Sequence, residues 1–455
     1  MTIRIANGAG FLGDNLDAPR RLVESAEVDY LTLEYLAELT MSILASIRAK
    51  NPGGGFASDF VEVLSILCPG LKQQQQLKIV TNAGGVNPMS CAKAAASILV
   101  AAGLDDEPIG VVAGDDILPR LGELQSAGCR FENLETGQPL AEVSEQIVAA
   151  NVYLGAKPIC DALMDDARFV ITGRVADACL TVGPAMKQFG WQWDDWNKLA
   201  AATVAGHLIE CGAQVTGGYS TLWDQYDLSD VGYPIAELSA DGGCVITKPM
   251  GTGGAVNRQT VVEQLVYEIG DPAHYLTPDV DVDFTTVEVQ ASEYDRVNVL
   301  GATGAPAPDN YKVSLAFRSG YTASGQLLVY GHDCVEKARK CSQIVFERLK
   351  CVGVDLAATN TEVLGAGTRF SSSHSNAKEV VLRLTVQDPR RETVVRFTKE
   401  IAPLITSGPA GLAGYAAGRS RVMPAFTYWP CLVPKELIEA QVEVRTAKEW
   451  AAYDD

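Results

Sequence analysis

The chain has 455 residues, and 47% of them are hydrophobic, which is enough for a large core and for two or three domains. Its 37 basic and 56 acidic side chains give a formal charge of −19, which argues against bulk binding to nucleic acid and against adhesion to an anionic membrane surface. No apolar stretch approaches the roughly 18–20 residues that span a bilayer, and the eleven cysteines lack C-x-x-C spacing, a pattern typical of reduced thiols. We therefore expect a cytoplasmic protein that binds neither nucleic acid nor membranes.

One module recurs through the first half of the chain: a short apolar run, then glycines and polar residues, then a helical pattern. It appears as IRIAN before GAGFLGDN, KIVT before NAGGVNPMS, IGVVA before GDD and ARFVIT before GRVADA. Alternating strand-like and helix-like segments predict a parallel sheet covered by helices. In such sheets the loops gather at the carboxyl ends of the strands, where ligands bind. We expect the active face there.

Beyond Pro278 the pattern changes to successive strands, among them DFTTVEVQ, DRVNVLG and QLLVYG, with one long helix near residues 333–349. Such a mixture is typical of an α+β domain in which several strands are antiparallel. The sequence therefore predicts an α/β fold. A mostly parallel, helix-covered sheet that carries the Gly/polar loops is expected over residues 1–275, and a smaller α+β domain over residues 276–455.

The first loop, GAGFLG, matches G-x-G-x-x-G directly after a strand, as in a dinucleotide site. Asp14 and Asp17 would crowd a pyrophosphate with negative charge, and Pro19 interrupts the helix that should begin there. We therefore favour a turn that positions Asp14 and Asn15, and keep a nicotinamide-dependent oxidoreductase as an alternative.

Glu34 and Glu38 follow at the end of the strand-like DYLTLEY and lie four residues apart, so they can share one helix face. They could form an acid/base pair or hold a hard cation. The alternative is a pair of solvated carboxylates that stabilise a helix amino terminus. Glu38, with Asp14 nearby, is our candidate for moving a proton.

The loop NAGGVNP opens the next helix. Its side-chain and backbone amides come from Asn82, Gly84, Gly85 and Asn87, and they could cradle a carboxylate, a phosphate or a thioester oxygen. A tight turn with a capping asparagine is the alternative interpretation.

Two later segments add titratable side chains. Arg174 could bind a carboxylate or phosphate while Asp177 orients it, although a structural ion pair explains the same spacing. In GHLIECG, His207 lies three and four residues from Glu210 and Cys211, which resembles half a metal site or an acid/base couple. An interior, hydrogen-bonded histidine is the favoured interpretation. No third ligand is evident, so we expect no metal and no other cofactor.

Lys248 precedes a glycine-rich turn that contains Gly253 and Gly254. This is not a Walker loop, in which the lysine follows the glycines, but it could place one cation and several amides around an anionic group. Near the carboxyl terminus, SGPAGLAGYAAGRSR lets the backbone approach a ligand or another subunit closely, which makes a homo-oligomer our expectation.

These blocks resemble, in order and over nearly the whole chain, the acyclic terpene utilisation proteins of the AtuA type. The resemblance is carried by GFLGDN, NAGGVNP, GRVADACLTVGPA, GHLIECGAQVTGGY, KPMGTGGAVNRQ and GPAGLAGYAAGRSR. It implies a place in the degradation of branched acyclic terpenoids such as citronellol and geraniol, which proceeds through CoA thioesters. It also adds Gln214 to the polar loop positions.

We therefore expect a catabolic enzyme that acts on a branched acyl-CoA or related carboxylate by hydration, dehydration or carbon–carbon lyase chemistry. The expected catalytic residues are Glu38, Asp14, Asp177 and His207. The expected substrate-binding residues are Asn15, Asn82, Gly84, Gly85, Asn87, Arg174, Gln214, Lys248, Gly253 and Gly254. The alternative is a non-catalytic acyl-CoA-binding or assembly subunit that works beside a carboxylase or hydratase.

Overall fold

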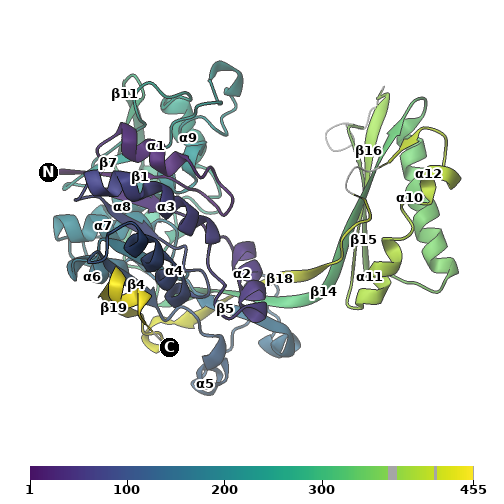
Figure 1. The fold of residues 1–455 in the computed structure, drawn as a ribbon, viewed down its shortest axis with the longest axis horizontal. Coiled ribbons are helices and arrows are strands. Elements are labelled where there is room, and N and C mark those ends of the chain that lie inside the picture. The colour runs from purple at the N-terminus through teal and green to yellow at the C-terminus, as the bar shows by residue number, and fades with distance from the viewer. Residues whose placement is uncertain (367–376, 415–417, 454–455) are drawn as a thin grey trace. The chain divides into compact units, whose positions relative to one another are not determined.

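The computed structural model describes residues 1–366, 377–414 and 418–453 (Figure 1). The chain forms two compact units. The first contains Met1–Ser144, Val148–Ala316 and Tyr428–Asp455, and the second contains Glu145–Ile147 and Phe317–Thr427.

A mixed sheet forms the centre of the first unit, and within the described residues it has ten strands. Its order is β11-β12-β8-β7-β1-β2-β3-β6-β4-β19. The central strands are parallel to one another: β1 (Thr2–Asn7), β2 (Tyr30–Leu33), β3 (Lys78–Thr81), β6 (Phe169–Thr172) and β4 (Pro108–Ala113). Four of them are the strands of the recurring module, so the predicted α/β class is confirmed.

Antiparallel strands extend this sheet on both sides. One side adds β7 (Ile235–Ser239), β8 (Cys244–Thr247), β12 (Arg296–Leu300) and β11 (Glu288–Glu293), and the other adds β19 (Gln441–Thr446). A small separate sheet contains β9 (Tyr275–Leu276), β10 (Asp281–Asp283) and β13 (Thr303–Ala305).

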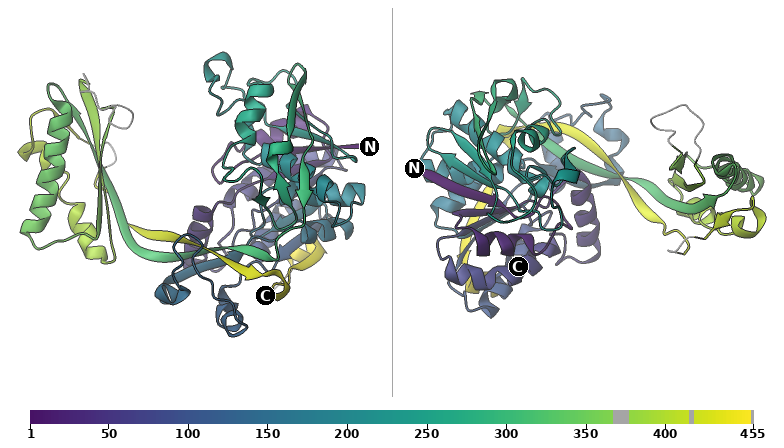
Figure 2. Two further views of the ribbon diagram at one scale, coloured as in Figure 1. Left: turned by 180° about the vertical axis from the view of Figure 1, so that it is seen from behind. Right: turned by 90° about the horizontal axis from the view of Figure 1, so that it is seen from above.

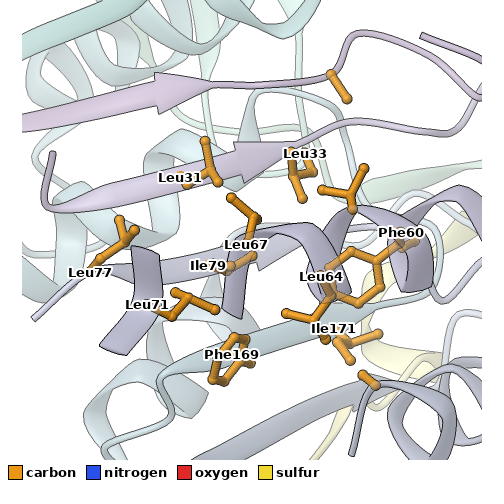
Figure 3. Packing of buried hydrophobic residues seen from close by; sticks show 14 of the residues in the cluster. Leu31, Leu33, Phe60, Leu64, Leu67, Leu71, Leu77, Ile79, Phe169 and Ile171 are labelled. Carbon is orange, nitrogen blue, oxygen red and sulfur yellow. The ribbon is translucent and has the colours of Figure 1, made fainter. Parts of the chain in front are cut away.

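Helices cover both faces of the large sheet. Successive strand residues point to opposite faces, and Ile79 and Val80 are both fully buried as a result. The helices of this unit are α1 (Ala18–Ser25), α2 (Glu38–Lys50), α3 (Ser58–Gln73), α4 (Pro88–Ala101), α5 (Leu121–Ser126), α6 (Lys157–Met164), α7 (Cys179–Phe189), α8 (Trp196–Glu210), α9 (Arg258–Leu265) and α13 (Ala447–Ala451). Figure 3 shows Leu64, Leu67 and Leu71 of α3 packed against strand side chains such as Leu31 and Ile79. These contacts bury the apolar stripe of α3 and fix the strands whose ends carry the polar loops.

Residues 276–316 and 428–455 belong to the first unit, although the sequence led us to expect a division between residues 275 and 276. The reason is strand pairing: β12 pairs with β8, and β19 pairs with β4. The carboxyl-terminal segment, yellow in Figure 2, returns to the first unit.

The second unit is built on antiparallel strands in the order β15-β16-β14-β17. Their bounds are β15 (Ala358–Leu364), β16 (Glu379–Asp388), β14 (Asn310–Tyr330) and β17 (Leu412–Ala413), and residues 310–316 of β14 belong to the first unit. The helices are α10 (Cys334–Cys351), which is the predicted long helix, α11 (Arg391–Phe397) and α12 (Leu404–Ser407). Two further strands, β5 (Ile147–Val152) and β18 (Met423–Pro434), pair with β14. Alternate residues of β16 are buried from Val380 to Val386, as expected for a sheet covered on one face.

The remaining short elements are 3-10 helices: η1 (Leu118–Arg120), η2 (Leu140–Glu142), η3 (Ser144–Gln146), η4 (Gly212–Gln214), η5 (Trp223–Gln225), η6 (Phe284–Thr286) and η7 (Lys435–Leu437). Within the part of the chain that the structure describes, no helix combines the length and the apolar composition needed to cross a membrane.

Candidate functional site

A cavity of about 940 Å³ lies in the first unit, where the loops after β1, β2 and β6 meet the end of α8. This is the edge formed by the carboxyl ends of the parallel strands, where a ligand site is expected in an open α/β sheet. Six of the residues expected at the site line the cavity: Asp14, Glu38, Arg174, Asp177, His207 and Gln214. Glu34 and Glu210, which were considered beside them in the sequence, line it as well.

Glu38 lies at the start of α2 and faces two donors. The Tyr153 hydroxyl donates to Glu38 Oε1 at 2.5 Å, and Lys312 Nζ lies 3.6 Å from the same oxygen. Burial works to raise the pKa of Glu38, but the Tyr153 hydrogen bond and the charges of Arg174 and Lys312 outweigh it, so this pKa is lowered. Glu38 is therefore ionised at neutral pH.

Arg174 lines the cavity, and its side chain is only 2% exposed. Its Nη2 lies 2.9 Å from Asp177 Oδ1, and its Nη1 donates to the Leu36 carbonyl at 3.0 Å. The guanidinium carbon lies 4.2 Å from the centre of the Tyr153 ring, a cation–π contact. Arg174 is thus held by three different elements.

Among the carboxyl groups of the cavity that remain partly exposed, Asp177 has the pKa that lies furthest from its ordinary value. Burial raises the pKa of Asp177 to about 7; Arg174 works against this shift, and Glu210 and Glu38 add to it. Its side chain is 36% exposed, so it can exchange a proton with a ligand in the cavity.

Glu34 follows β2 directly and is 4% exposed. Its Oε1 accepts hydrogen bonds from the Leu36 backbone N–H at 2.9 Å and from Asn82 Nδ2. Asn82 is fixed in turn, because its Oδ1 accepts from the Tyr35 backbone N–H at 2.8 Å. The predicted cradle residue Asn82 therefore holds a cavity carboxyl group and does not itself line the cavity.

His207 lies near the end of α8 with both ring nitrogens engaged. Nε2 donates to the Gln264 carbonyl at 2.9 Å, since a carbonyl can only accept, and Nδ1 lies 3.2 Å from Glu210 Oε1. Burial works to lower the pKa of His207, but Glu210 and the Gln264 carbonyl raise it. The favoured interpretation from sequence, an interior histidine with hydrogen-bond partners, describes this geometry, and Glu210 is its acidic partner.

Both carboxylate oxygens of Asp14 accept hydrogen bonds, from its own loop and from Tyr233. Its Oδ2 accepts from the Gly10 N–H at 2.8 Å, and its Oδ1 accepts from the Tyr233 hydroxyl at 2.5 Å and the Asn15 N–H at 2.7 Å. Gly10 is required because a Cβ there would lie 2.6 Å from the Cys211 carbonyl carbon. Gly10 thus lets the first loop pack against the residues that follow α8, while Asn15 is exposed beside it.

The remaining residues expected to bind substrate lie outside the cavity lining. Asn87 caps α4, with Oδ1 accepting from the Ser90 N–H, and Gly85 adopts a φ of +55°. A Cβ on Gly84 would lie 2.5 Å from the Thr172 carbonyl oxygen. This loop is the tight, capped turn that was the alternative interpretation.

Lys248 is likewise engaged elsewhere. It is 5% exposed, and its Nζ lies 2.9 Å from Asp295 Oδ2 and donates to the Thr252 carbonyl at 2.8 Å. Gly253 and Gly254 approach the backbone of other loops closely, and Gly254 has a φ of +74°. The Lys248 turn is therefore a packed structural loop.

Among the cavity residues that the sequence analysis did not single out are Tyr153, Lys312 and Tyr233. None of them belongs to a glycine-rich loop or a charged spacing pattern. Tyr153 follows β5, and Lys312 lies in β14, far along the chain. Their chemistry depends on long-range packing, which no local signal in the sequence records.

We expect Arg174→Met to lower the free energy of unfolding by about 3 kcal/mol, because removing one partner of a buried ion pair leaves the other charge uncompensated. Breaking a buried ion pair costs about 3–5 kcal/mol in general. The low end of that range applies here because the Asp177 side chain is 36% exposed and can be solvated. Denaturant unfolding followed by tryptophan fluorescence measures this loss. Arg174→Lys is the control, since it keeps the charge but not the flat contact with Tyr153. Wild-type stability in Arg174→Met would show that the pair contributes nothing.

Comparison with protein families identifies one relationship. The family described as acyclic terpene utilisation family protein AtuA matches residues 3–444. The chain belongs to the AtuA family. The resemblance inferred from the sequence blocks is confirmed. No curated protein and no solved structure matches this AtuA family chain. Among its described residues, no group of three His, Cys, Asp or Glu side chains could hold a metal ion.

Proposed function

We propose that this AtuA family chain is an acid–base enzyme of acyclic terpenoid degradation that acts on a branched acyl-CoA or a related carboxylate. The reaction is a hydration, a dehydration or a carbon–carbon cleavage. One observation carries the proposal: Glu38 and Asp177 line one cavity with their pKa values shifted in opposite directions. Carboxyl groups whose environments separate their pKa values are suited to act as base and acid.

The roles follow from the protonation states. Glu38 is ionised, so it accepts the proton from the carbon next to the substrate carbonyl. Asp177, with a pKa of about 7, still carries a proton in about half of the molecules at neutral pH and gives it to the departing hydroxyl group. In a dehydration the C–H electron pair becomes the new C=C bond, and the C–O pair leaves with the oxygen as water.

The rim of the cavity supports an aliphatic substrate. Large apolar side chains line it while remaining exposed, among them Phe11 at 59%, Leu134 at 54% and Leu276 at 62% exposure. Exposed apolar groups gathered around a polar floor are typical of ligand-binding grooves. A branched hydrocarbon chain would cover them.

The first experiment is a thermal-shift panel of CoA, branched acyl-CoAs, free branched acids, NAD(H) and divalent metals, followed by turnover assays with the purified chain. A ligand that binds the native state selectively raises the melting temperature. Stabilisation and turnover by a branched acyl-CoA or acid is the expected result. Binding without turnover would favour the non-catalytic subunit, and stabilisation by NAD(H) alone would revive the oxidoreductase.

A pH profile tests the role of Asp177. Because the acid must be protonated, kcat/KM is expected to fall about tenfold per pH unit above the pKa of about 7 and to be level between this pKa and the lower pKa of Glu38. Asp177→Asn removes the titrating group, so the remaining activity should lose this alkaline limb. A limb that persists unchanged in Asp177→Asn would assign it to another group.

We further propose that the protein works in the cytoplasm as a homo-oligomer. The eleven cysteines are free thiols, which suits a reducing compartment. Size-exclusion chromatography with light scattering measures the oligomeric state directly.

A further inference from the structure

The two oxygens of Glu34 lie in unlike surroundings. Oε1 accepts two hydrogen bonds, from the Leu36 N–H and from Asn82 Nδ2. Oε2 is buried and has no hydrogen-bond partner among the described residues. The residue as a whole is 4% exposed and lines the cavity. One carboxyl oxygen is therefore saturated, and the other is enclosed in the cavity wall without a hydrogen-bond partner in the described part of the chain.

This asymmetry fits a neutral acid and not a carboxylate. An ionised carboxylate only accepts hydrogen bonds, so burying one of its oxygens without a donor leaves the charge uncompensated. In a neutral acid the carbonyl oxygen accepts, which matches Oε1, and the hydroxyl is a donor, which matches an Oε2 that awaits an acceptor. The geometry thus assigns the proton to Oε2.

The charges around Glu34 agree with this assignment. Arg174, the nearby cation, directs its hydrogen bonds to Leu36 and its ion pair to Asp177. Burial and the charge of Asp177 raise the pKa of Glu34 well above its ordinary value, against the lowering influence of Arg174, Asn82 and Leu36. The loop after β1 contributes a neutral group, the Ala9 carbonyl, which accepts from the Glu34 backbone N–H at 2.9 Å.

We propose that Glu34 remains protonated in the resting protein and that its Oε2 hydroxyl donates a hydrogen bond to the substrate carbonyl oxygen. As Glu38 removes the neighbouring proton, that oxygen gains negative charge, and the hydrogen bond strengthens. Glu34 keeps its own proton throughout. Asn82 is the positioning residue, because it holds Oε1 and so leaves Oε2 as the oxygen for which the described residues provide no partner. The role at the carbonyl rests on the proposed function, whereas the protonation of Glu34 does not.

The protonation state can be measured without turnover. In protein labelled with ¹³C at the glutamate side-chain carboxyl carbon, the signal that Glu34→Gln removes belongs to Glu34. We expect it to have the chemical shift of a protonated acid at about pH 7, where an ordinary glutamate is ionised. The Glu38 signal, assigned by Glu38→Gln, is the internal comparison and should be that of a carboxylate. A Glu34 signal typical of a carboxylate at pH 7 would overturn the proposal.

Two variants test the hydrogen bond itself. Glu34→Gln keeps an acceptor for Leu36 and Asn82 and offers an N–H donor to the cavity, so kcat should fall by about tenfold or less. Glu34→Leu offers no donor, and kcat should fall by about 10²–10³-fold with little change in KM. Equal, large losses in both variants would mean that the Glu34 proton is transferred, and would overturn the hydrogen-bonding role.

The two proposals fail separately. If no branched acyl-CoA or acid is turned over, the proposed function falls, while the NMR titration still decides the state of Glu34. If Glu34→Leu does not fold, the NMR titration of the wild-type protein and the kcat of Glu34→Gln remain as tests, because a loss of 10²-fold or more in Glu34→Gln alone contradicts the donor role.

Discussion

Trp450→Ala is expected to lower the free energy of unfolding of the first unit by about 3–5 kcal/mol, the range for removing a fully buried tryptophan. Trp450 lies in α13 and is 0% exposed. Its indole Nε1 donates to the Ile109 carbonyl in β4 at 2.9 Å, and α13 packs against α4. The variant would open a cavity beneath the central sheet and leave a backbone carbonyl without its donor.

Urea unfolding followed by tryptophan fluorescence measures this loss in the right unit, because all six tryptophans belong to the first unit. Trp450→Phe is the matched control. It fills most of the space but removes the donor, so it should cost about 1–3 kcal/mol. A loss below about 1 kcal/mol in Trp450→Ala would mean that α13 is not part of this core.

The carboxyl-terminal segment that contains α13 also shows which parts of the fold could not be predicted from the sequence. The strands IRIAN, KIVT, IGVVA and FVIT could be predicted because each combines a short apolar run with a glycine-rich loop, which are local signals. The pairing of β19 with β4 could not, since it joins Gln441–Thr446 to Pro108–Ala113 across more than half of the chain. For that reason the sequence led us to group residues 428–455 with the second domain.

The residues of the cavity likewise divide into those that the sequence could predict and those that it could not. Glu38, Arg174 and Asp177 could be proposed because they directly follow strands whose carboxyl ends meet at one edge. Polar residues in other strand-end loops that lie outside the cavity lining, such as Asn87 after β3, are indistinguishable in sequence from those that face a ligand. Lys248 shows this most clearly, because its ion-pair partner Asp295 lies on a separate loop.

We expect Glu38→Gln to lower kcat by about 10²–10⁴-fold, the usual contribution of a general base, with little change in stability. The amide cannot accept a proton, but its oxygen can still accept the hydrogen bond from Tyr153, so the cavity wall keeps its shape. The measurement is steady-state kinetics on the acyl-CoA or acid that stabilises the wild-type protein, with thermal shift to confirm that the variant still binds it.

Tyr153→Phe is the control that separates the carboxylate from its surroundings. It leaves Glu38 in place but removes the hydrogen bond that lowers the pKa of Glu38. Since Glu38 must be ionised to act as the base, activity is lost as the pH falls through its pKa, and in Tyr153→Phe this acidic limb should move to higher pH. Activity at high pH should then recover toward the wild-type level, which Glu38→Gln cannot do at any pH. Wild-type turnover in Glu38→Gln would instead assign the base to another carboxylate of the cavity, with Glu210, the partner of His207, as the next group to replace.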